Sequence, residues 1–132
     1  MLTEPQMIAA FDEALRSFDL DPESCREGAD WWRFKLGGVA FQGGVHRADV
    51  RIFAAVCKLD SDVDLDALYA ATAAAEAPGL ATFKESDNYL NAAASLPFAG
   101  VSQERIERAI RDCLAAATSP AADALKSRWR AW

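Results

Sequence analysis

The sequence predicts an α+β fold, in which a mostly antiparallel sheet packs on helices in the order α-β-β-β-α-β-β-α, followed by a short C-terminal helix. Apolar residues recur at helical spacing in residues 4–19 and 102–117. Apolar and polar residues alternate, as strands require, in residues 30–36, 49–59 and 88–96. Because the strand segments do not alternate strictly one by one with helices, a parallel α/β sheet is disfavoured.

The first helix is predicted from its cap and from one apolar stripe. Thr3-Glu4-Pro5-Gln6 matches a capping box, in which the Thr3 hydroxyl and the Gln6 side chain satisfy backbone N–H groups. Proline fits the first turn, where its missing N–H costs no hydrogen bond. The helix should end near Asp19, before Pro22, and its stripe comprises Met7, Ile8, Phe11, Leu15 and Phe18.

Three strands are expected next. Residues 30–36 alternate, with Trp32, Phe34 and Leu36 on one face and Trp31, Arg33 and Lys35 on the other. Gly37-Gly38 and Gly43-Gly44 are interpreted as turns on either side of a short strand over residues 39–41. Residues 49–59 form the clearest strand, with Val50, Ile52, Ala54 and Val56 on one side and Arg51, Phe53, Ala55 and Cys57 on the other.

A helix, a hairpin and two further helices complete the chain. Asp62 or Asp64 caps a helix that Pro78-Gly79 ends, and its predicted inner face carries Leu65, Leu68, Tyr69 and Thr72. Residues 80–83 and 88–96 are expected to form a hairpin joined around residues 85–87, with Leu90 and Tyr89 on opposite faces. Ser102 opens a long helix whose stripe comprises Ile106, Ile110, Cys113, Leu114 and Ala117. Ser119-Pro120 opens a short one that carries Leu125, Trp129 and Trp132.

These segments are expected to form one domain over residues 1–132, with a core of about residues 4–117 and an additional helix at about residues 120–131. A length of 132 residues and 52% hydrophobic residues are enough for one hydrophobic core. The net charge of −6 is too modest to predict disorder.

Charge and composition exclude several classes of function. The pI of about 4.7 disfavours nucleic acid as a partner, because such proteins neutralise phosphates with a basic surface. The six bases of residues 101–132 are interpreted as helix-end charges. There is no stretch of apolar residues long enough for a membrane span, and the N-terminal residues do not resemble a secretory signal. Three widely spaced cysteines suit free thiols in a reducing compartment, so a cytoplasmic location is expected.

No catalytic residue, metal site or cofactor is predicted. The acidic run from Asp60 to Asp66 lacks the glycine and the bidentate glutamate of a calcium loop, because Leu65 and Ala71 occupy those positions. It is interpreted as a solvated loop before a helix N-terminus. His46 is the only histidine, and we interpret it as an exposed turn residue. No phosphate-binding loop, dinucleotide fingerprint or nucleophile elbow occurs.

The aromatic side chains that alternation directs away from the core are the predicted binding residues. Trp31 and Trp32 are adjacent in one strand, so both cannot enter the same core. By the same argument Phe53 lies opposite Ile52, and Tyr89 lies opposite Leu90. If helices cover one side of the sheet, Trp31, Phe53 and Tyr89 lie on the other side. They then either bind a partner, as exposed aromatic clusters often do, or are covered permanently by a helix or a second subunit.

The element order, together with the Leu90-x-Ala92-x-Ala94-x-Leu96-Pro97-Phe98 strand that leads through Gly100 into Ser102-x-Glu104-x-Ile106, resembles a known family. It is similar to the type III secretion chaperone-like proteins, in particular the Tir-chaperone and YbjN-like group. This resemblance covers roughly residues 4–117, and the helix after Ser119 lies outside it. It implies a non-enzymatic, often homodimeric fold that presents apolar surfaces to an extended segment of a partner. In the secretion chaperones that partner is an effector protein, whereas a regulatory role is implied for YbjN-like members.

The leading hypothesis is therefore a cytoplasmic chaperone-like or adaptor domain that binds a protein or peptide segment at Trp31, Phe53 and Tyr89. Two alternatives remain open. One is a small-molecule-binding protein or minor enzyme with a pocket between sheet and helices. The other is a structural homo-oligomer in which a second copy covers the three aromatic residues.

Overall fold

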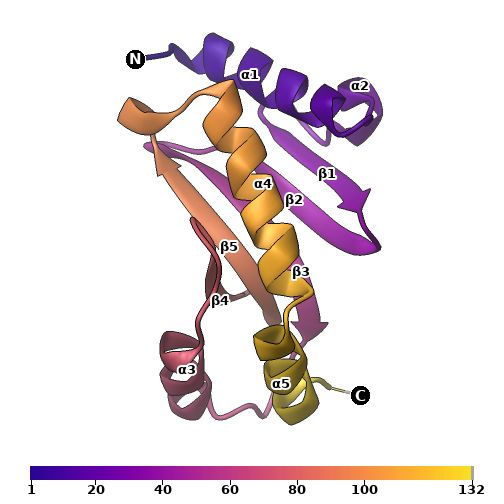
Figure 1. Ribbon diagram of the computed structural model, residues 1–132, viewed down its shortest axis with the longest axis vertical. Coiled ribbons are helices and arrows are strands. Elements are labelled where there is room, and N and C mark those ends of the chain that lie inside the picture. Colours follow the sequence, from indigo (N-terminus) through magenta and orange to yellow (C-terminus); the bar gives the residue numbers. More distant parts are fainter. Residues whose placement is uncertain (132) are drawn as a thin grey trace.

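A computed structural model describes residues 1–131 and shows a five-stranded sheet with the strand order β1-β2-β3-β5-β4 (Figure 1). All four strand pairs are antiparallel. The sheet and the helices confirm the predicted α+β class and element order. The strands are β1 (Trp31–Leu36), β2 (Val39–Val45), β3 (Asp49–Lys58), β4 (Thr82–Ser86) and β5 (Tyr89–Pro97).

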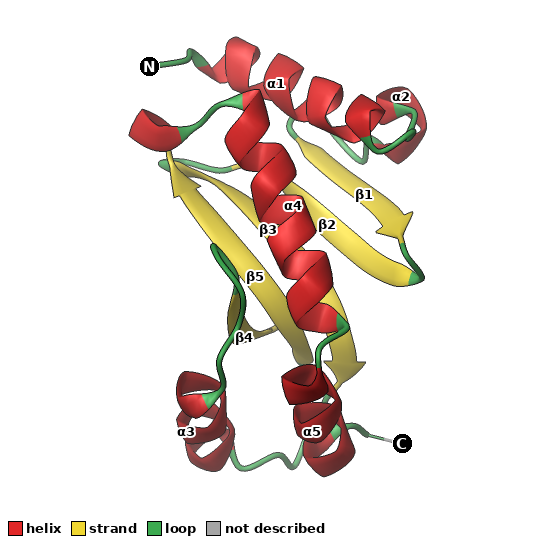
Figure 2. Ribbon diagram, in the orientation of Figure 1, coloured by secondary structure: helices red, strands yellow, loops and turns green. Residues whose placement is uncertain are grey.

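The long helix α4 lies on one side of the sheet, and the other helices lie toward its two ends (Figure 2). In this view α4 lies in front of the sheet, α1 lies across its upper end, and α3 and α5 lie near its lower end. The single-turn helix α2 and the 3-10 turn η1 are not among the predicted elements. The helical segments are α1 (Glu4–Ser17), α2 (Pro22–Cys25), α3 (Leu65–Ala74), η1 (Phe98–Gly100), α4 (Gln103–Ala117) and α5 (Pro120–Trp129).

The longer helices have side-chain caps at their N-termini, at residues that the sequence indicates. Thr3 and Gln6 form the complete capping box of α1. Of the two aspartates considered for α3, Asp64 is the cap, and its carboxylate accepts a hydrogen bond from the backbone N–H of Ala67. Ser102 and Ser119 cap α4 and α5 in the same way. Each cap satisfies one N–H group that lacks a partner within the helix.

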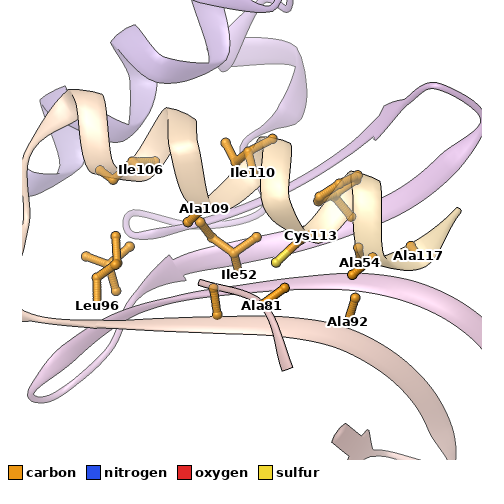
Figure 3. Packing of buried hydrophobic residues seen from close by; sticks show 14 of the residues in the cluster. Ile52, Ala54, Ala81, Ala92, Leu96, Ile106, Ala109, Ile110, Cys113 and Ala117 are labelled. Atoms are coloured by element: carbon orange, nitrogen blue, oxygen red, sulfur yellow. The ribbon is translucent and has the colours of Figure 1, made fainter. Parts of the chain in front are cut away.

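The hydrophobic core lies between α1, α4 and one face of the sheet (Figure 3). Ile52 and Leu96 of the sheet are buried together with Ile106 and Ile110 of α4, and all four are at most 1% exposed. Alanines such as Ala54, Ala92 and Ala109 lie at the same contact, so the helix can approach the sheet closely. The predicted apolar faces of the first and third long helices are therefore the ones that build the core.

Gly43 and Gly44 do not form the predicted turn, because β2 continues through both of them. A Cβ atom on Gly43 would lie 2.7 Å from the carbonyl oxygen of Arg51 and 3.2 Å from Cζ of Phe11. One on Gly44 would lie 2.5 Å from Cε3 of Trp31. Glycine is thus required here by close packing within a strand rather than by a turn. The other pair, Gly37-Gly38, does form the expected turn, with φ values of 56° and 78°.

The predicted inner face of α3 is wrong at two positions. Leu68 is buried, but Leu65 is 42% exposed and Tyr69 is 50% exposed. The helix lies beside β4 and α5 near one end of the sheet, so only one side chain reaches the core. It also ends at Ala74, before Pro78-Gly79.

The strand β3 contains an irregularity that moves Cys57 away from its predicted side. The pairing of β3 with β5 shifts between Ala55 and Cys57, so that Cys57 pairs with Leu90. Cys57 then packs partly against the core and lies near the charges of Lys126 and Arg130 in the C-terminal region.

The C-terminal helix docks on the rest of the molecule. Leu125 is buried, and Trp129 packs against the core while remaining partly exposed. Beyond α5, Arg130 forms a single antiparallel bridge with Leu59. The predicted role of Trp132 falls outside the described residues.

Candidate functional site

The candidate site is the sheet face opposite α1 and α4, which we call the open face. Strand pairing places residues of all five strands on it. It comprises Trp31, Arg33 and Lys35 of β1; Ala40, Gln42 and Gly44 of β2; Asp49, Arg51, Phe53, Ala55 and Lys58 of β3; Thr82, Lys84 and Ser86 of β4; and Tyr89, Asn91, Ala93, Ser95 and Pro97 of β5.

The three predicted binding residues all lie on the open face and outside the hydrophobic core. Trp31 and Phe53 are partly exposed, and Tyr89 is 42% exposed. By contrast Trp32, the neighbour of Trp31, is fully buried. Its indole stacks on Phe11 with the ring centroids 4.3 Å apart. Strand alternation therefore separates the two tryptophans as expected, although their role in binding stays a prediction.

Phe53 occupies the middle of the open face and connects the other two aromatic residues. It shares one hollow of about 680 Å³ with Trp31 and Arg51, and a second of about 270 Å³ with Tyr89 and Arg33. It also lines a third hollow of about 370 Å³ beside Thr82. Trp31 and Tyr89 do not line a common hollow. The aromatic residues thus form a line of contact points rather than one compact cluster.

Small side chains form the floor between these aromatic residues. Phe53 pairs with Gln42 on one side and with Ala93 on the other. Ala93 is only 6% exposed although it does not belong to the core cluster, because larger side chains surround it. Asn91, which is 5% exposed, donates a hydrogen bond of 3.2 Å to the carbonyl oxygen of Tyr89. A floor of this kind lets a bound segment approach the sheet backbone closely.

The charged side chains of the open face are mainly basic, and no role was predicted for them from the sequence. The strand residues of this face include five bases, Arg33, Lys35, Arg51, Lys58 and Lys84, and one acid, Asp49. Alternation along the first and third strands could have placed Arg33, Lys35 and Arg51 on this side. Lys84 required the register of β4 against β5, which pairs it with Asn91.

Asp49 forms a local network that neutralises one of these bases. Its carboxylate accepts a hydrogen bond of 2.9 Å from Nε of Arg51 and one of 2.7 Å from the hydroxyl of Ser95. Burial raises the pKa of Asp49, but the hydrogen bonds from Ser95 and Arg51 and the charges of Arg51 and His46 outweigh burial, so the pKa lies below its ordinary value. Asp49 is therefore charged at neutral pH and holds Arg51 in place.

The other polar candidates of the sequence lie away from the middle of this face. His46 and Arg47 line the Trp31 end of the first hollow, together with Glu4 and Asp30. Asp60 accepts a hydrogen bond of 3.1 Å from the backbone N–H of Asp62, as a loop carboxylate often does. Within residues 1–131, no group of three or more His, Cys, Asp or Glu side chains is arranged to hold a metal ion.

The three thiols have environments that disfavour the thiolate. Burial raises the pKa of Cys113 to about 12, with a further contribution from the charge of Asp112. Burial also raises the pKa of Cys25, again helped by a nearby acid, Asp21. For Cys57 burial raises the pKa more than the charges of Lys126 and Arg130 lower it.

In the part of the chain that the structure describes, no helix is both long and apolar enough to cross a membrane.

Comparison with known proteins identifies a related fold. No family model matches the sequence, and no curated protein matches it either. A chain in the solved structure of the HopA1–SchA chaperone–effector complex is similar, with a TM-score of 0.60 and 12% sequence identity over 98% of both chains. The chain thus shares its fold, over nearly its whole length, with a component of a chaperone–effector complex. The YbjN-like part of the predicted resemblance stays a prediction.

Proposed function

We propose that this chain is a non-enzymatic, cytoplasmic, chaperone-like or adaptor domain that binds a segment of another protein on its open face. The observation that carries the proposal is the line of Trp31, Phe53 and Tyr89 on a sheet face opposite the helices that build the core. Large aromatic side chains left outside a core are typical anchors of protein interfaces. The similar fold in the HopA1–SchA chaperone–effector complex supports this class of function.

The shape of the open face supports a macromolecular partner over a small molecule. A small-molecule site is usually an enclosed cavity that buries most of its ligand. The hollows here lie side by side along the sheet, and Phe53 belongs to three of them. A long segment with several apolar side chains can occupy them together, whereas a small molecule would fill only one. These observations favour the protein-binding hypothesis over the pocket alternative.

Site-specific photocrosslinking tests the proposal. Phe53 is replaced by the photoreactive residue benzoylphenylalanine in the full chain, which is then expressed in its native host and irradiated. We expect a covalent adduct with a protein other than a second copy of the chain. The matched control carries the same residue at Arg111, an exposed position on α4, and should not form this adduct.

Two results would contradict the proposal. Adducts of Phe53 only with a second copy would support the structural homo-oligomer, in which the open face is permanently covered. Equal adduct formation from the Phe53 and Arg111 positions would mean that the open face has no preferred partner.

We also propose a homodimer, and the exposed side of α3 is the surface that favours it. Leu65 and Tyr69 lie one turn apart on this helix and are 42% and 50% exposed. The neighbouring exposed residues Ala70, Ala73 and Ala74 are small enough for another helix to pack closely. Light scattering should therefore give twice the mass of the chain, and Tyr69→Asp should give the mass of one. An unchanged mass in this variant would remove α3 from the interface.

A further inference from the structure

We infer that the partner segment is an acidic amphipathic helix that lies across the open face, with apolar side chains on Phe53 and acidic side chains against Arg33, Lys35 and Lys84. This inference rests on the proposed function and adds the chemistry of the partner. The open face differs in charge from the chain as a whole. Five of the strand residues on this face are bases and one is an acid, whereas the whole chain has a net charge of −6.

Three of the bases lie on the two edge strands of the sheet, and Lys58 lies at the end of the middle strand β3. Arg33 and Lys35 belong to the edge strand β1, and Lys84 belongs to the opposite edge strand β4. Arg51, nearer the middle, is already paired with Asp49. Arg33 has only a distant partner, with its Nε 3.9 Å from the Glu27 carboxylate, and both side chains are more than half exposed. Such a surface pair is weak, so Arg33 is available to a partner.

The space between these edges suits one helix. The sheet is curved, so that Arg33 of β1 and Ser86 at the end of β4 line the same hollow. A helix with its side chains is about 10–12 Å across, so a helix bound over this hollow can reach both basic edges with long acidic side chains. The floor contains Ala55 and Ala93, much as Ala54 and Ala92 lie beneath α4 on the other face. A helix can therefore approach the open face as closely as α4 approaches the core face.

A helix is favoured over a strand for this position because of backbone hydrogen bonds. A strand pairs with the edge of a sheet, where N–H and C=O groups are free, and not with its face. An extended segment on the face would leave its own backbone groups without protein partners, whereas a helix satisfies them internally.

An acidic protein segment is also favoured over nucleic acid, although bases and aromatic residues can bind either. The first hollow is lined by Glu4, Asp30 and Asp87 as well as by bases. These acids would repel a phosphate backbone that runs along the whole face. A helix avoids them by placing its acidic residues only opposite the bases.

The test selects binders from a random library of peptides of about 16 residues displayed on phage, using the full chain as the target. We expect the enriched peptides to be rich in Asp and Glu, with apolar residues three and four positions apart. A synthetic enriched peptide should lose at least tenfold in affinity when a proline is placed at its centre, because proline breaks a helix.

Charge-reversed variants identify the surface that the peptide contacts. The double variant Arg33→Glu/Lys84→Glu should bind the synthetic peptide at least tenfold more weakly, and Phe53→Ser should bind it more weakly still. The control Arg105→Glu/Arg111→Glu changes the net charge equally on the exposed side of α4 and should bind within twofold of the native chain. Circular dichroism confirms that each variant is folded.

Each other result overturns a defined part of the inference. Enriched peptides that are neutral or basic, or an unchanged affinity in the Arg33→Glu/Lys84→Glu variant, would overturn the acidic partner and leave the proposed function intact. Tight binding of the proline-containing peptide would overturn the helix. If no enriched peptide depends on Phe53, both this inference and the proposed function fail. Stronger binding of a dT oligonucleotide of about 16 nucleotides, lost in the charge-reversed variant, would assign the surface to nucleic acid.

Discussion

At the scale of single residues, a polar cluster around Trp32 fixes which way the first strand faces. The carboxylate of Asp12 accepts hydrogen bonds of 2.9 Å from the indole N–H of Trp32 and of 2.6 Å from Arg26. The Arg26 guanidinium also lies 5.0 Å from the centre of the Trp32 ring. Because Trp32 is held in the core by these contacts, its neighbour Trp31 must point to the open face.

Removing the Asp12 carboxylate should destabilise the protein clearly. Asp12→Ala leaves the Trp32 N–H and the charge of Arg26 without their shared partner, at side-chain positions that are only 15% and 23% exposed for Asp12 and Arg26. We expect a loss of about 2–3 kcal/mol in the free energy of unfolding, measured by urea denaturation.

The surface pair of Glu13 and Arg16 gives the matched control. Both side chains are about half exposed, so Glu13→Ala should cost less than about 1 kcal/mol. Similar losses in the two variants would show that the Asp12 cluster adds no more stability than an exposed ion pair.

Asp49 makes the stability of the sheet depend on pH. Because its pKa in the folded chain is lower than the ordinary value of 3.8, its stabilising contribution is complete above that pH and is lost as the pH falls through the folded-state pKa. Asp49→Asn should be less stable than the native chain at pH 7 by about 1 kcal/mol, since Arg51 is partly exposed. The difference should narrow as the pH falls below 3.8. A difference that stays the same as the pH falls would show that the charge of Asp49 is not responsible.

Single residues also show where prediction from the sequence succeeds and where it fails. The opposite orientations of Trp31 and Trp32 follow from strand alternation alone. Cys57 does not obey the same rule because a register shift precedes it, and such a shift depends on the pairing of β3 with β5. The face of Lys84 cannot be predicted from the sequence, because it depends on the register of β4 against β5 in the folded hairpin.

At the scale of elements, β2 shows how composition can mislead. Paired glycines usually indicate a turn, so the sequence predicts that the second strand ends before Gly43. In the structure the strand runs on to Val45, and the indole of Trp31 lies against Gly44, where a side chain would otherwise stand. The glycines therefore make room for Phe11 on the core face and for Trp31 on the open face.

The substitution Gly44→Ala tests this explanation of β2. The added methyl group would collide with Trp31 and with the backbone of Asp30, so we expect a loss of about 2 kcal/mol in the free energy of unfolding. Trp31 should also become more accessible to acrylamide, which quenches tryptophan fluorescence. Gly28→Ala is the control, because a Cβ atom there has no neighbour within 4 Å. Equal stability of the two variants would contradict the close packing at Gly44.

Helix α3 shows a second limit at this scale. The sequence predicts that the helix begins at Asp62 or Asp64, but it predicts neither its end at Ala74 nor its buried side. A helix at the end of a sheet contacts fewer neighbours than one lying across it, so spacing alone overstates how many of its apolar residues are buried. Leu65 and Tyr69 were predicted to lie on the inner face of α3 but are exposed for this reason.

At the scale of the whole molecule, the element order predicts the class of fold but not the order of the strands. Consecutive strands pair in β1-β2-β3 and in β4-β5, as hairpins usually do. The sequence does not reveal that β5 rather than β4 lies beside β3. This arrangement places Phe53 next to Ala93 and thereby sets the middle of the candidate site.

Overall charge is likewise a poor guide to a local surface. The chain is acidic, with a pI of about 4.7, yet the strand residues of its open face are mainly basic. The composition shows that the chain as a whole is not basic. The net charge of one sheet face, however, depends on how the five strands are placed side by side.

The most direct test of the account is hydroxyl-radical footprinting of the purified chain, alone at low and high concentration and with an enriched acidic peptide. We predict that Trp31, Phe53 and Tyr89 are oxidised at similar rates at both concentrations and are protected at least threefold by the peptide, while Tyr69 is not protected by it. Protection of Trp31, Phe53 and Tyr89 in the chain alone, with no further change on adding the peptide, would contradict an open face that receives a partner.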